Sequence, residues 1–134
     1  MKRFAWILVL CVAGCFYQGV KGVYYVTMET ESLDADGDGV QDGITVFLVF
    51  RDRDFNVVSF YDAECRAVVR VYDDHGLVCE KEVSFDSSEL VGKAGGGIPV
   101  VVSNGDNKYG DITVVVYIEG RGEFHTEKKN VKLG

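Results

Sequence analysis

The chain is poor in the residue types on which several common functions depend. Its 134 residues include one proline, one tryptophan and two histidines. His75 and His125 lie far apart in the sequence, and neither belongs to an HExxH zinc motif or to the nucleophile motif of a hydrolase. The sequence therefore gives no support to a zinc peptidase or a serine hydrolase, and both histidines are expected to be exposed.

Basic residues are also scarce. The chain has 14 lysines and arginines against 21 aspartates and glutamates, for a net charge of −7. Binding to a phosphate backbone is driven largely by basic side chains, and no basic stretch interleaved with aromatic residues offsets the acidic excess. Nucleic acid is therefore not expected as a partner.

Long apolar runs are missing as well, and the run near the N-terminus is too short to span a bilayer. Lys2 and Arg3 precede an uncharged run from Phe4 to Gly14, which is about half the roughly 20 residues that a transmembrane helix needs. A charged head, a short apolar segment and small residues at its end are typical of a secretory signal. Residues 1–14 are therefore interpreted as a signal peptide, which places the mature chain outside the cytoplasm.

The end of this segment, Val12-Ala13-Gly14-Cys15, resembles the lipobox of bacterial lipoproteins, and similar boxes occur in some archaeal secreted proteins. The resemblance implies that the Cys15 thiol receives a diacylglyceryl group and that cleavage occurs just before it. Two acyl chains are enough for stable membrane anchoring. An ordinary signal peptide with a chance cysteine, or an uncleaved anchor, is the alternative.

Cleavage before Cys15 would leave 120 residues, which is enough for one compact domain. It would also lower the basic count to 12 and bring the net charge to −9. Residues 15–21 are then expected to be a lipid-anchored tether, and residues 22–134 a single domain at the extracytoplasmic side of the cell envelope.

Two further cysteines, Cys65 and Cys79, lie in "AECRAVVRVYDDHGLVCEKEVSF", which is predicted to form one hairpin that turns at "DDHG". If Cys79 faces Val69, this register separates the two cysteines by about 13 Å along the strand, whereas a disulfide needs Cα atoms within about 7 Å. Two buried thiols are therefore expected. A disulfide requires a bulge or a different register, and the cysteines and histidines lack the spacing of zinc ligands.

Much of the domain alternates apolar and polar residues, the period typical of β-strands. Residues 43–52 are apolar at both sets of alternate positions, so this strand is expected to be covered on both faces. The two sets are Ile44, Val46, Leu48 and Phe50, and, opposite them, Phe47 and Val49. Further strands are predicted at residues 22–30, 55–60, 63–85, 98–103, 111–120 and 123–133, a helical turn at residues 86–90 and a loop at residues 91–97.

Six or seven short strands without a long helical pattern predict an all-β fold, an antiparallel β-sandwich of about seven strands. The arms "AVVRVYDDHGLV" and "DITVVVYIEG" give the chain a resemblance to the immunoglobulin-like and fibronectin-like superfamily. The core tryptophan and paired cysteines of antibody domains are missing, since the sole tryptophan is Trp6. A small β-barrel is the alternative.

Residues 34–43, "DADGDGVQDG", concentrate four aspartates in a short stretch. Asp34, Asp36 and Asp38 occupy positions 1, 3 and 5 of a DxDxDG loop. The carbonyl of Val40 falls at position 7, and Asp42 at position 9. Ca²⁺ takes six to eight oxygen ligands, and carboxylates on a tightly curled backbone converge on one point. The spacing therefore predicts a calcium site.

The pattern resembles the calcium loops of EF-hands, dockerins and thrombospondin type 3 repeats. It departs from the EF-hand at position 12, where Thr45 replaces a bidentate glutamate, but it meets the shorter DxDxDGxxD form in full. The resemblance implies a structural ion bound in the weak extracellular range, about 0.1 to 1 mM; the alternative is an acidic turn without metal. Positive φ angles are expected at Gly37, Gly39 and Gly43. Any further ligand is expected from Glu29, Glu31, Asp52 or Asp54.

Two weaker features could also bind ligands. Asp106, Asn107 and Asp111 offer oxygens for a second calcium ion, although Asn104-Gly105 beside them is first of all a turn signal. Several aromatic residues could stack on sugars, although most are expected to be core or cross-strand residues. They are Tyr24, Tyr25, Phe60, Tyr61, Tyr72 and Tyr109.

These features predict a calcium-stabilised, lipid-anchored binding, adhesion or envelope module that is not an enzyme. Its ligand is a protein or a polysaccharide, and a carbohydrate-binding role and a structural role are both compatible with the residues. The alternative is an accessory domain or small hydrolase that uses Asp52, Asp54 and Asp62. A hydrolase would need converging carboxylates in a pocket, one of them with a perturbed pKa.

Overall fold

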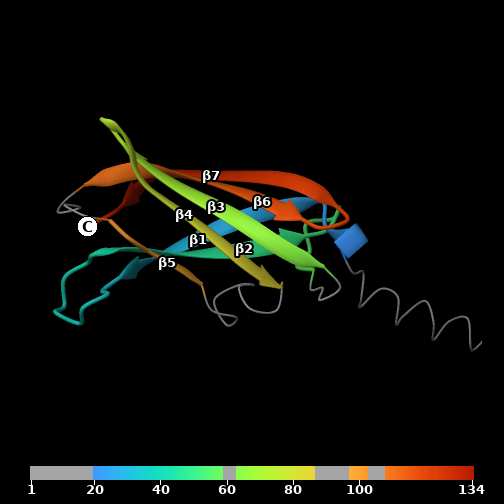
Figure 1. Ribbon diagram of the computed structural model, residues 1–134, viewed down its shortest axis with the longest axis horizontal. Coiled ribbons are helices and arrows are strands. Elements are labelled where there is room, and N and C mark those ends of the chain that lie inside the picture. The colour runs from blue at the N-terminus through green and yellow to red at the C-terminus, as the bar shows by residue number, and fades with distance from the viewer. Residues whose placement is uncertain (1–19, 59–62, 87–96, 103–107) are drawn as a thin grey trace, which may run out of the picture.

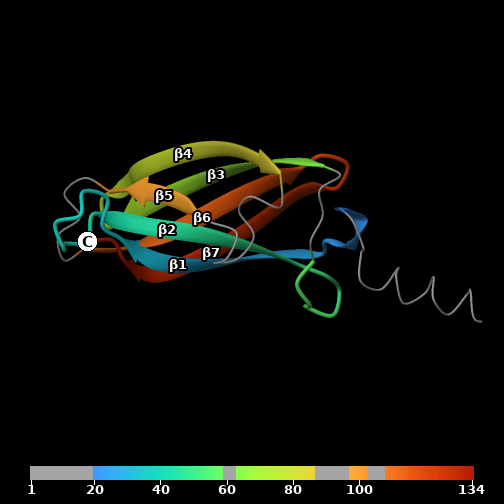
Figure 2. The ribbon, with the colours of Figure 1, turned by 90° about the horizontal axis from the view of Figure 1, so that it is seen from below.

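The computed structural model describes residues 20–58, 63–86, 97–102 and 108–134, which form two facing antiparallel sheets (Figures 1 and 2). One sheet has the order β1-β2-β5 and the other β4-β3-β6-β7. The predicted all-β, antiparallel sandwich of seven strands is confirmed, and the barrel alternative is wrong because the described strands form two open sheets. The elements are η1 (Val20–Gly22), β1 (Tyr25–Leu33), β2 (Gly43–Arg51), β3 (Glu64–Asp73), β4 (Gly76–Asp86), β5 (Ile98–Val101), β6 (Tyr109–Ile118) and β7 (Gly122–Lys132).

The core lies between the sheets, where alternate residues of β2, β3 and β6 meet. The four alternating residues Ile44 to Phe50 of β2 are all buried, and four alternate residues of β3, which the same two-residue period predicts to face inward, are buried as well. They are Ile44, Val46, Leu48 and Phe50 in β2, and Cys65, Ala67, Val69 and Val71 in β3. Phe47 and Val49, on the opposite face of β2, are buried too. The expectation that this strand is covered on both faces is therefore confirmed.

The β3–β4 hairpin is confirmed, but its register differs from the predicted one by two residues. Cys79 pairs with Val71 instead of Val69, and Cys65 pairs with Phe85. The difference arises because the hairpin closes on a two-residue turn, after which the pairing shifts at a bulge next to Val71. The cysteines are therefore farther apart than predicted, and no disulfide joins them. Cys65 is buried as expected, whereas Cys79 is only half-buried.

This difference in burial predicts selective thiol chemistry. In native protein comprising residues 18–134, a thiol reagent is expected to modify Cys79 well before Cys65, which is 3% exposed, because the reagent must reach the sulfur. In denaturant both cysteines should react. Peptide mapping after a short native labelling pulse checks this, and equal labelling of the two cysteines would contradict it.

Three predicted elements differ from the structure or fall outside it. Residues 55–58 belong to no strand and form a single bridge, between Arg51 and Val57, so the strand predicted at residues 55–60 is wrong for the described part. The helical turn at residues 86–90 and the loop at residues 91–97 lie almost entirely outside the described residues.

Pro99 lies in β5, an edge strand, as its missing N–H predicts. Where the chain is described, no helix is long and apolar enough to cross a bilayer.

The sandwich has two distinct ends along its long axis. Residues 34–42 lie at one end, whereas η1 and the turn at residues 52–56 lie at the other (Figures 1 and 2). β2 runs between these ends, and its nine residues span roughly 30 Å at about 3.3 Å each. Groups at the two ends therefore cannot share one binding site.

Candidate metal centre

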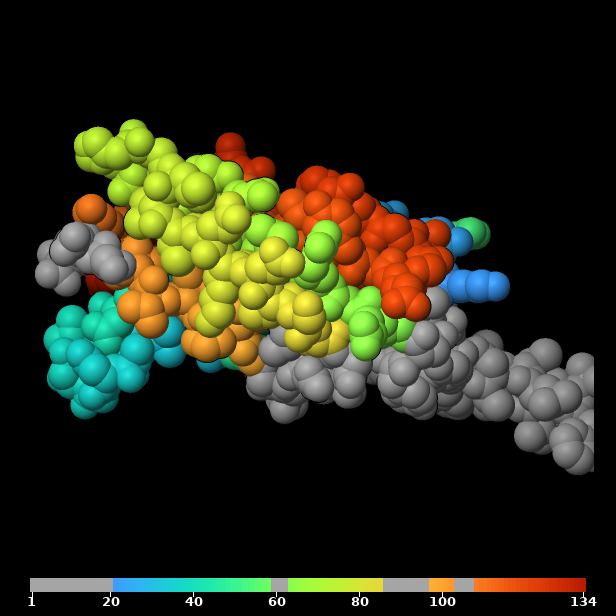
Figure 3. Space-filling model, in the orientation of Figure 1, coloured from blue at the N-terminus to red at the C-terminus, as the bar shows by residue number. Residues whose placement is uncertain are grey.

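Residues 34–42 connect β1 to β2 and stand out from the sandwich as a lobe (Figure 3). The base of this acidic loop is held by backbone hydrogen bonds from Asp42 N to Leu33 O (2.7 Å) and from Val102 N to Asp42 O (2.9 Å). The side-chain amide of Gln41 donates to the carbonyls of Gly43 (2.9 Å) and Lys132 (2.8 Å). The loop is exposed, yet both of its ends are fixed to the sheets.

The acidic loop brings together the four aspartates that the spacing predicts. Asp34, Asp36, Asp38 and Asp42 each contribute a carboxylate oxygen to a group whose members all lie within 4.8 Å of one another. Val40 is exposed in the same loop, and its N–H donates to Asp38 Oδ1 (2.8 Å). Exposed acidic groups also cluster without a metal, but oxygens at this spacing can surround one hard cation.

Hydrogen bonds from the backbone hold the carboxylates in place. Asp34 accepts from the N–H groups of Gly37 (2.9 Å), Asp38 (3.2 Å) and Gly39 (2.7 Å). Asp42 Oδ2 accepts from the N–H groups at positions 35 (3.0 Å) and 36 (3.3 Å) at the start of the loop. These bonds join the start, middle and end of the loop and hold the carboxylate oxygens close together.

The glycines of the loop have two different roles. Gly37 and Gly39 have φ angles of 74° and 85°, as predicted for a backbone that curls around a cation. The prediction is wrong for Gly43, which is buried in β2 and is not among the residues with positive φ. A Cβ at Gly43 would collide with the carbonyl oxygen of Val100. Glycine is needed there because β5 approaches β2 closely.

The crowded charges change the acidity of the loop. The N–H of Gly39, the largest single influence, holds the pKa of Asp34 below its ordinary value. At Asp36 the N–H of Asp38 lowers the pKa, but this is outweighed by a carboxyl–carboxyl hydrogen bond with Asp38, by desolvation and by repulsion from Asp38 and Asp42. The pKa of Asp36 therefore rises to about 6. The loop carries more negative charge than it accommodates well, and a cation would relieve the repulsion.

This shift predicts how the stability of the metal-free protein depends on pH. The pKa of Asp36 is about 6 in the folded state, above its ordinary value, so the folded state holds this proton more tightly than the unfolded state. Lowering the pH from 7 to 5 in the presence of chelator should therefore favour folding through this group. Melting curves of wild type and Asp36→Asn test this, because only the wild type should gain this increment; parallel pH profiles would contradict it.

The expected additional ligands do not join the cluster. Asp52 and Asp54 follow β2 and lie at the opposite end of the sandwich, so the prediction that they could complete the site is wrong. Glu29 and Glu31 lie on β1, but neither belongs to the group of converging oxygens found among the described residues. Backbone carbonyls and water commonly complete such calcium sites.

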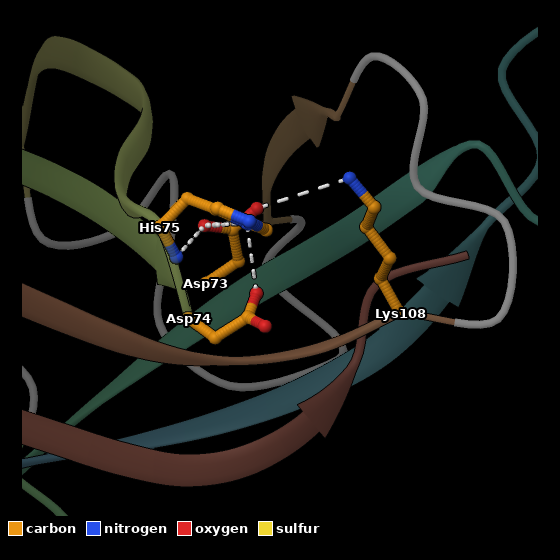
Figure 4. Close-up of polar contacts among 4 residues, drawn as sticks. All are labelled: Asp73, Asp74, His75 and Lys108. Atoms are coloured by element: carbon orange, nitrogen blue, oxygen red, sulfur yellow. Dashed lines mark hydrogen bonds and ion pairs between the residues drawn. The ribbon is translucent and has the colours of Figure 1, made fainter.

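A second acidic cluster lies at the β3–β4 turn, where Asp73, Asp74 and His75 offer ligand atoms within 4.8 Å (Figure 4). Here a lysine offsets part of the charge. Lys108 Nζ lies 3.8 Å from Asp73 Oδ2, and His75 Nδ1 lies 3.1 Å from Asp74 Oδ1. Asp73 Oδ1 also accepts the N–H of His75 (2.7 Å). These contacts stabilise a turn and leave less demand for a metal than at residues 34–42.

The remaining predicted ligands are placed as follows. His75 and His125 are both exposed, as expected. Of the second calcium site, Asp106 and Asn107 lie outside the described residues, and Asp111 accepts the N–H of Asn130 (3.2 Å). The described residues therefore contain only one of its three expected ligands.

Asp52 has a structural environment at the turn after β2. Its side chain is buried, and its Oδ1 accepts the N–H groups of Asp54 and Asn56, both at 2.9 Å. Asp54 is exposed, and Asp62 lies outside the described residues. Two backbone donors on one carboxylate are typical of a residue that closes a turn, which gives no support to the hydrolase alternative.

The aromatic residues are more exposed than the sequence predicts. Tyr24, Tyr25 and Tyr109 have large exposed fractions, and Tyr72 is half-buried. Phe60 and Tyr61 lie outside the described residues. None of the three exposed tyrosines is a core residue, because they lie at or beside strand starts, at the ends of the sandwich. Tyr25 and Tyr109 are cross-strand residues, as expected, and pair with Arg51 and Lys132. The exposed ring of Phe55 was not anticipated, since its segment alternates like a strand.

Comparisons of the whole chain with protein-family models, curated proteins and solved structures find no match. The likeness of residues 34–43 to calcium loops therefore depends on the aspartate spacing and on the geometry of the acidic loop.

Proposed function

We propose that the chain is a calcium-stabilised β-sandwich, tethered to the extracytoplasmic side of a membrane through a lipid on Cys15. The observation that carries the calcium part is the convergence of four aspartate carboxylates within 4.8 Å on a loop curled by its own backbone hydrogen bonds. The ion would neutralise these charges and stabilise the β1–β2 connection. The tether is supported by the lipobox-like residues 12–15.

A binding, adhesion or envelope-associated role fits this arrangement better than catalysis. The converging carboxylates lie on an exposed loop, whereas acid–base catalysis generally uses groups in a cleft that excludes water. Asp52, the one buried carboxylate among the described core residues, closes a turn. A protein or a polysaccharide of the envelope is the proposed ligand class.

Direct binding of calcium tests the metal site. Isothermal titration of residues 18–134 with calcium should show one saturable site in the range of about 0.1 to 1 mM. The Asp36→Asn/Asp38→Asn variant should not bind, because two ligands lose their charge. The control variant Asp54→Asn/Asp74→Asn also removes two negative charges, but at exposed positions outside the loop, and should bind calcium as the wild type does. Absence of saturable binding to the wild type would overturn the site.

Fatty-acid labelling tests the tether. The full chain, expressed in a bacterium with lipoprotein-modifying enzymes and fed a clickable fatty acid, should carry the label and sediment with membranes. Cys15→Ser should lose the label, whereas Cys11→Ser, a matched change four residues earlier, should retain it. Label that persists in Cys15→Ser, or is absent from the wild type, would reject the lipid anchor.

A further inference from the structure

The end of the sandwich opposite the acidic loop carries an exposed set of aromatic rings and arginines. The rings of Tyr24, Tyr25 and Phe55 belong to residues that are 40%, 47% and 52% exposed. They come from the start of β1 and from the turn after β2, and an arginine of the β6–β7 turn lies beside them. This aromatic–arginine surface consists of Tyr24, Tyr25, Arg51, Arg53, Phe55 and Arg121.

The arginines of this surface lie over aromatic rings. The guanidinium carbon of Arg51 is 4.5 Å from the ring centre of Phe55, and those of Arg53 and Arg121 are each 5.0 Å from that of Tyr24. Across the described residues, no carboxylate forms an ion pair with any of the three. On the outer face of the larger sheet, by contrast, Arg66 and Arg70 pair with glutamates at 3.5 and 2.9 Å.

Phe55 is held in an unusual conformation. Its φ angle is 69°, a left-handed conformation that bulky residues rarely adopt. The turn enforces this, because Phe55 N donates to Asp52 O (3.0 Å) and the Asp52 carboxylate fixes the neighbouring N–H groups. A strained residue with an exposed ring is not accounted for by core packing, and such strain is concentrated at functional positions.

We propose that the aromatic–arginine surface docks on an anionic phospholipid membrane. Aromatic side chains are favoured at the membrane–water interface, and arginines bind phosphate oxygens while their stems cover apolar groups. The surface lies beside η1, at which the described chain begins, so a lipid on Cys15, five residues before Val20, would bring it to the lipid headgroups. This inference rests on the proposed tether.

The position of the acidic loop is compatible with this orientation. The acidic loop lies roughly 30 Å away at the other end of β2, several times the Debye length of about 8 Å at physiological ionic strength. A negative membrane surface would therefore repel the loop little when the opposite end is docked. The calcium site would face away from the membrane, open to the external medium.

Footprinting of the tethered full chain tests the docking. The lipidated chain is reconstituted in phosphatidylcholine vesicles with and without phosphatidylglycerol, and oxidation by hydroxyl radicals is followed by mass spectrometry. With phosphatidylglycerol, Tyr24, Tyr25 and Phe55 should lose most of their oxidation. Tyr109, which is 59% exposed and lies at the start of β6, at the far end of the sandwich, should keep it and serves as the internal control.

Two variants separate docking from stability. Phe55→Gly removes the ring and relieves the positive φ, so the fold should be retained while the protection of Tyr24 and Tyr25 falls. Arg53→Glu reverses an exposed charge and, at about five-fold per charge near an anionic surface, should weaken docking on the order of 25-fold. Lys132→Glu makes the same change at the other end and should leave protection intact.

The outcomes distinguish the two proposals. Vesicle flotation together with selective, phosphatidylglycerol-dependent protection supports docking. Flotation with equal protection of Tyr25 and Tyr109, or with none, overturns docking but leaves the tether in place. A chain that does not float with any vesicle overturns the tether, and with it the docking that rests on it.

Discussion

Calcium at about 10 mM is expected to raise the free energy of unfolding of residues 18–134 by about 1.4 to 2.7 kcal/mol, if the ion binds the folded state with a dissociation constant of about 0.1 to 1 mM. The reason is that Asp34, Asp36, Asp38 and Asp42 converge only when the β1–β2 connection is folded. For a domain of this size, the gain corresponds to roughly 5 to 10 °C in melting temperature. Thermal melts in calcium and in chelator measure it.

The matched variants decide where the ion acts. In Asp36→Asn/Asp38→Asn the calcium-dependent rise in melting temperature should disappear. In chelator, the melting temperature of this variant should be at least as high as that of the wild type, because repulsion with Asp42 is reduced. Asp54→Asn/Asp74→Asn should keep the full rise. If calcium raised the melting temperature equally in both variants, the ion would be stabilising another part of the protein.

Truncation of Phe50 to alanine should lower the free energy of unfolding by about 3 to 5 kcal/mol, the range for a large aromatic removed from a core. Phe50 is fully buried between the sheets, and its ring centre lies 6.4 Å from that of Phe85. The inward neighbours of Phe50 come from fixed strands, so they can close the resulting cavity only in part. Urea denaturation measures this loss: the urea concentration at the midpoint of unfolding should fall, while the slope of the free energy of unfolding against urea concentration should not change.

The same chemical change at Phe55 is the control for this prediction. Phe55 is 52% exposed on the turn after β2, so Phe55→Ala should change the free energy of unfolding by less than about 1 kcal/mol. Both variants remove one phenyl ring, from a buried position at Phe50 and from an exposed position at Phe55. Similar losses in the two variants would mean that the sandwich core is not organised around β2 as described.

The predictions that held are those in which neighbours in sequence are also neighbours in space. In β2 the two-residue period by itself identified the residues that face the core, because successive side chains of a strand point to opposite faces. The convergence of Asp34, Asp36, Asp38 and Asp42 was predicted for a similar reason. These residues lie within one tight loop, which Gly37 and Gly39 allow to curl.

The predictions that failed depend on how distant segments meet. The pairing of Cys79 with Val71 depends on the geometry of the turn and on a bulge, and a slip of two residues preserves which side chains face the core. Gly43 looked like part of the curled loop, but its role is set by the approach of Val100, which comes much later in the chain. The strand pattern of residues 55–58 was overridden by the hydrogen bonds of Asp52.

The all-β class, the inward residues of the long strands and the acidic loop can be read from the amino-acid sequence alone, because each follows from the local geometry of a strand or a turn. The strand order, the remoteness of Asp52 from the acidic loop and the meeting of Tyr24, Phe55 and Arg121 become visible in the folded chain. These placements are set by the packing of two sheets against one another. No short segment carries that information.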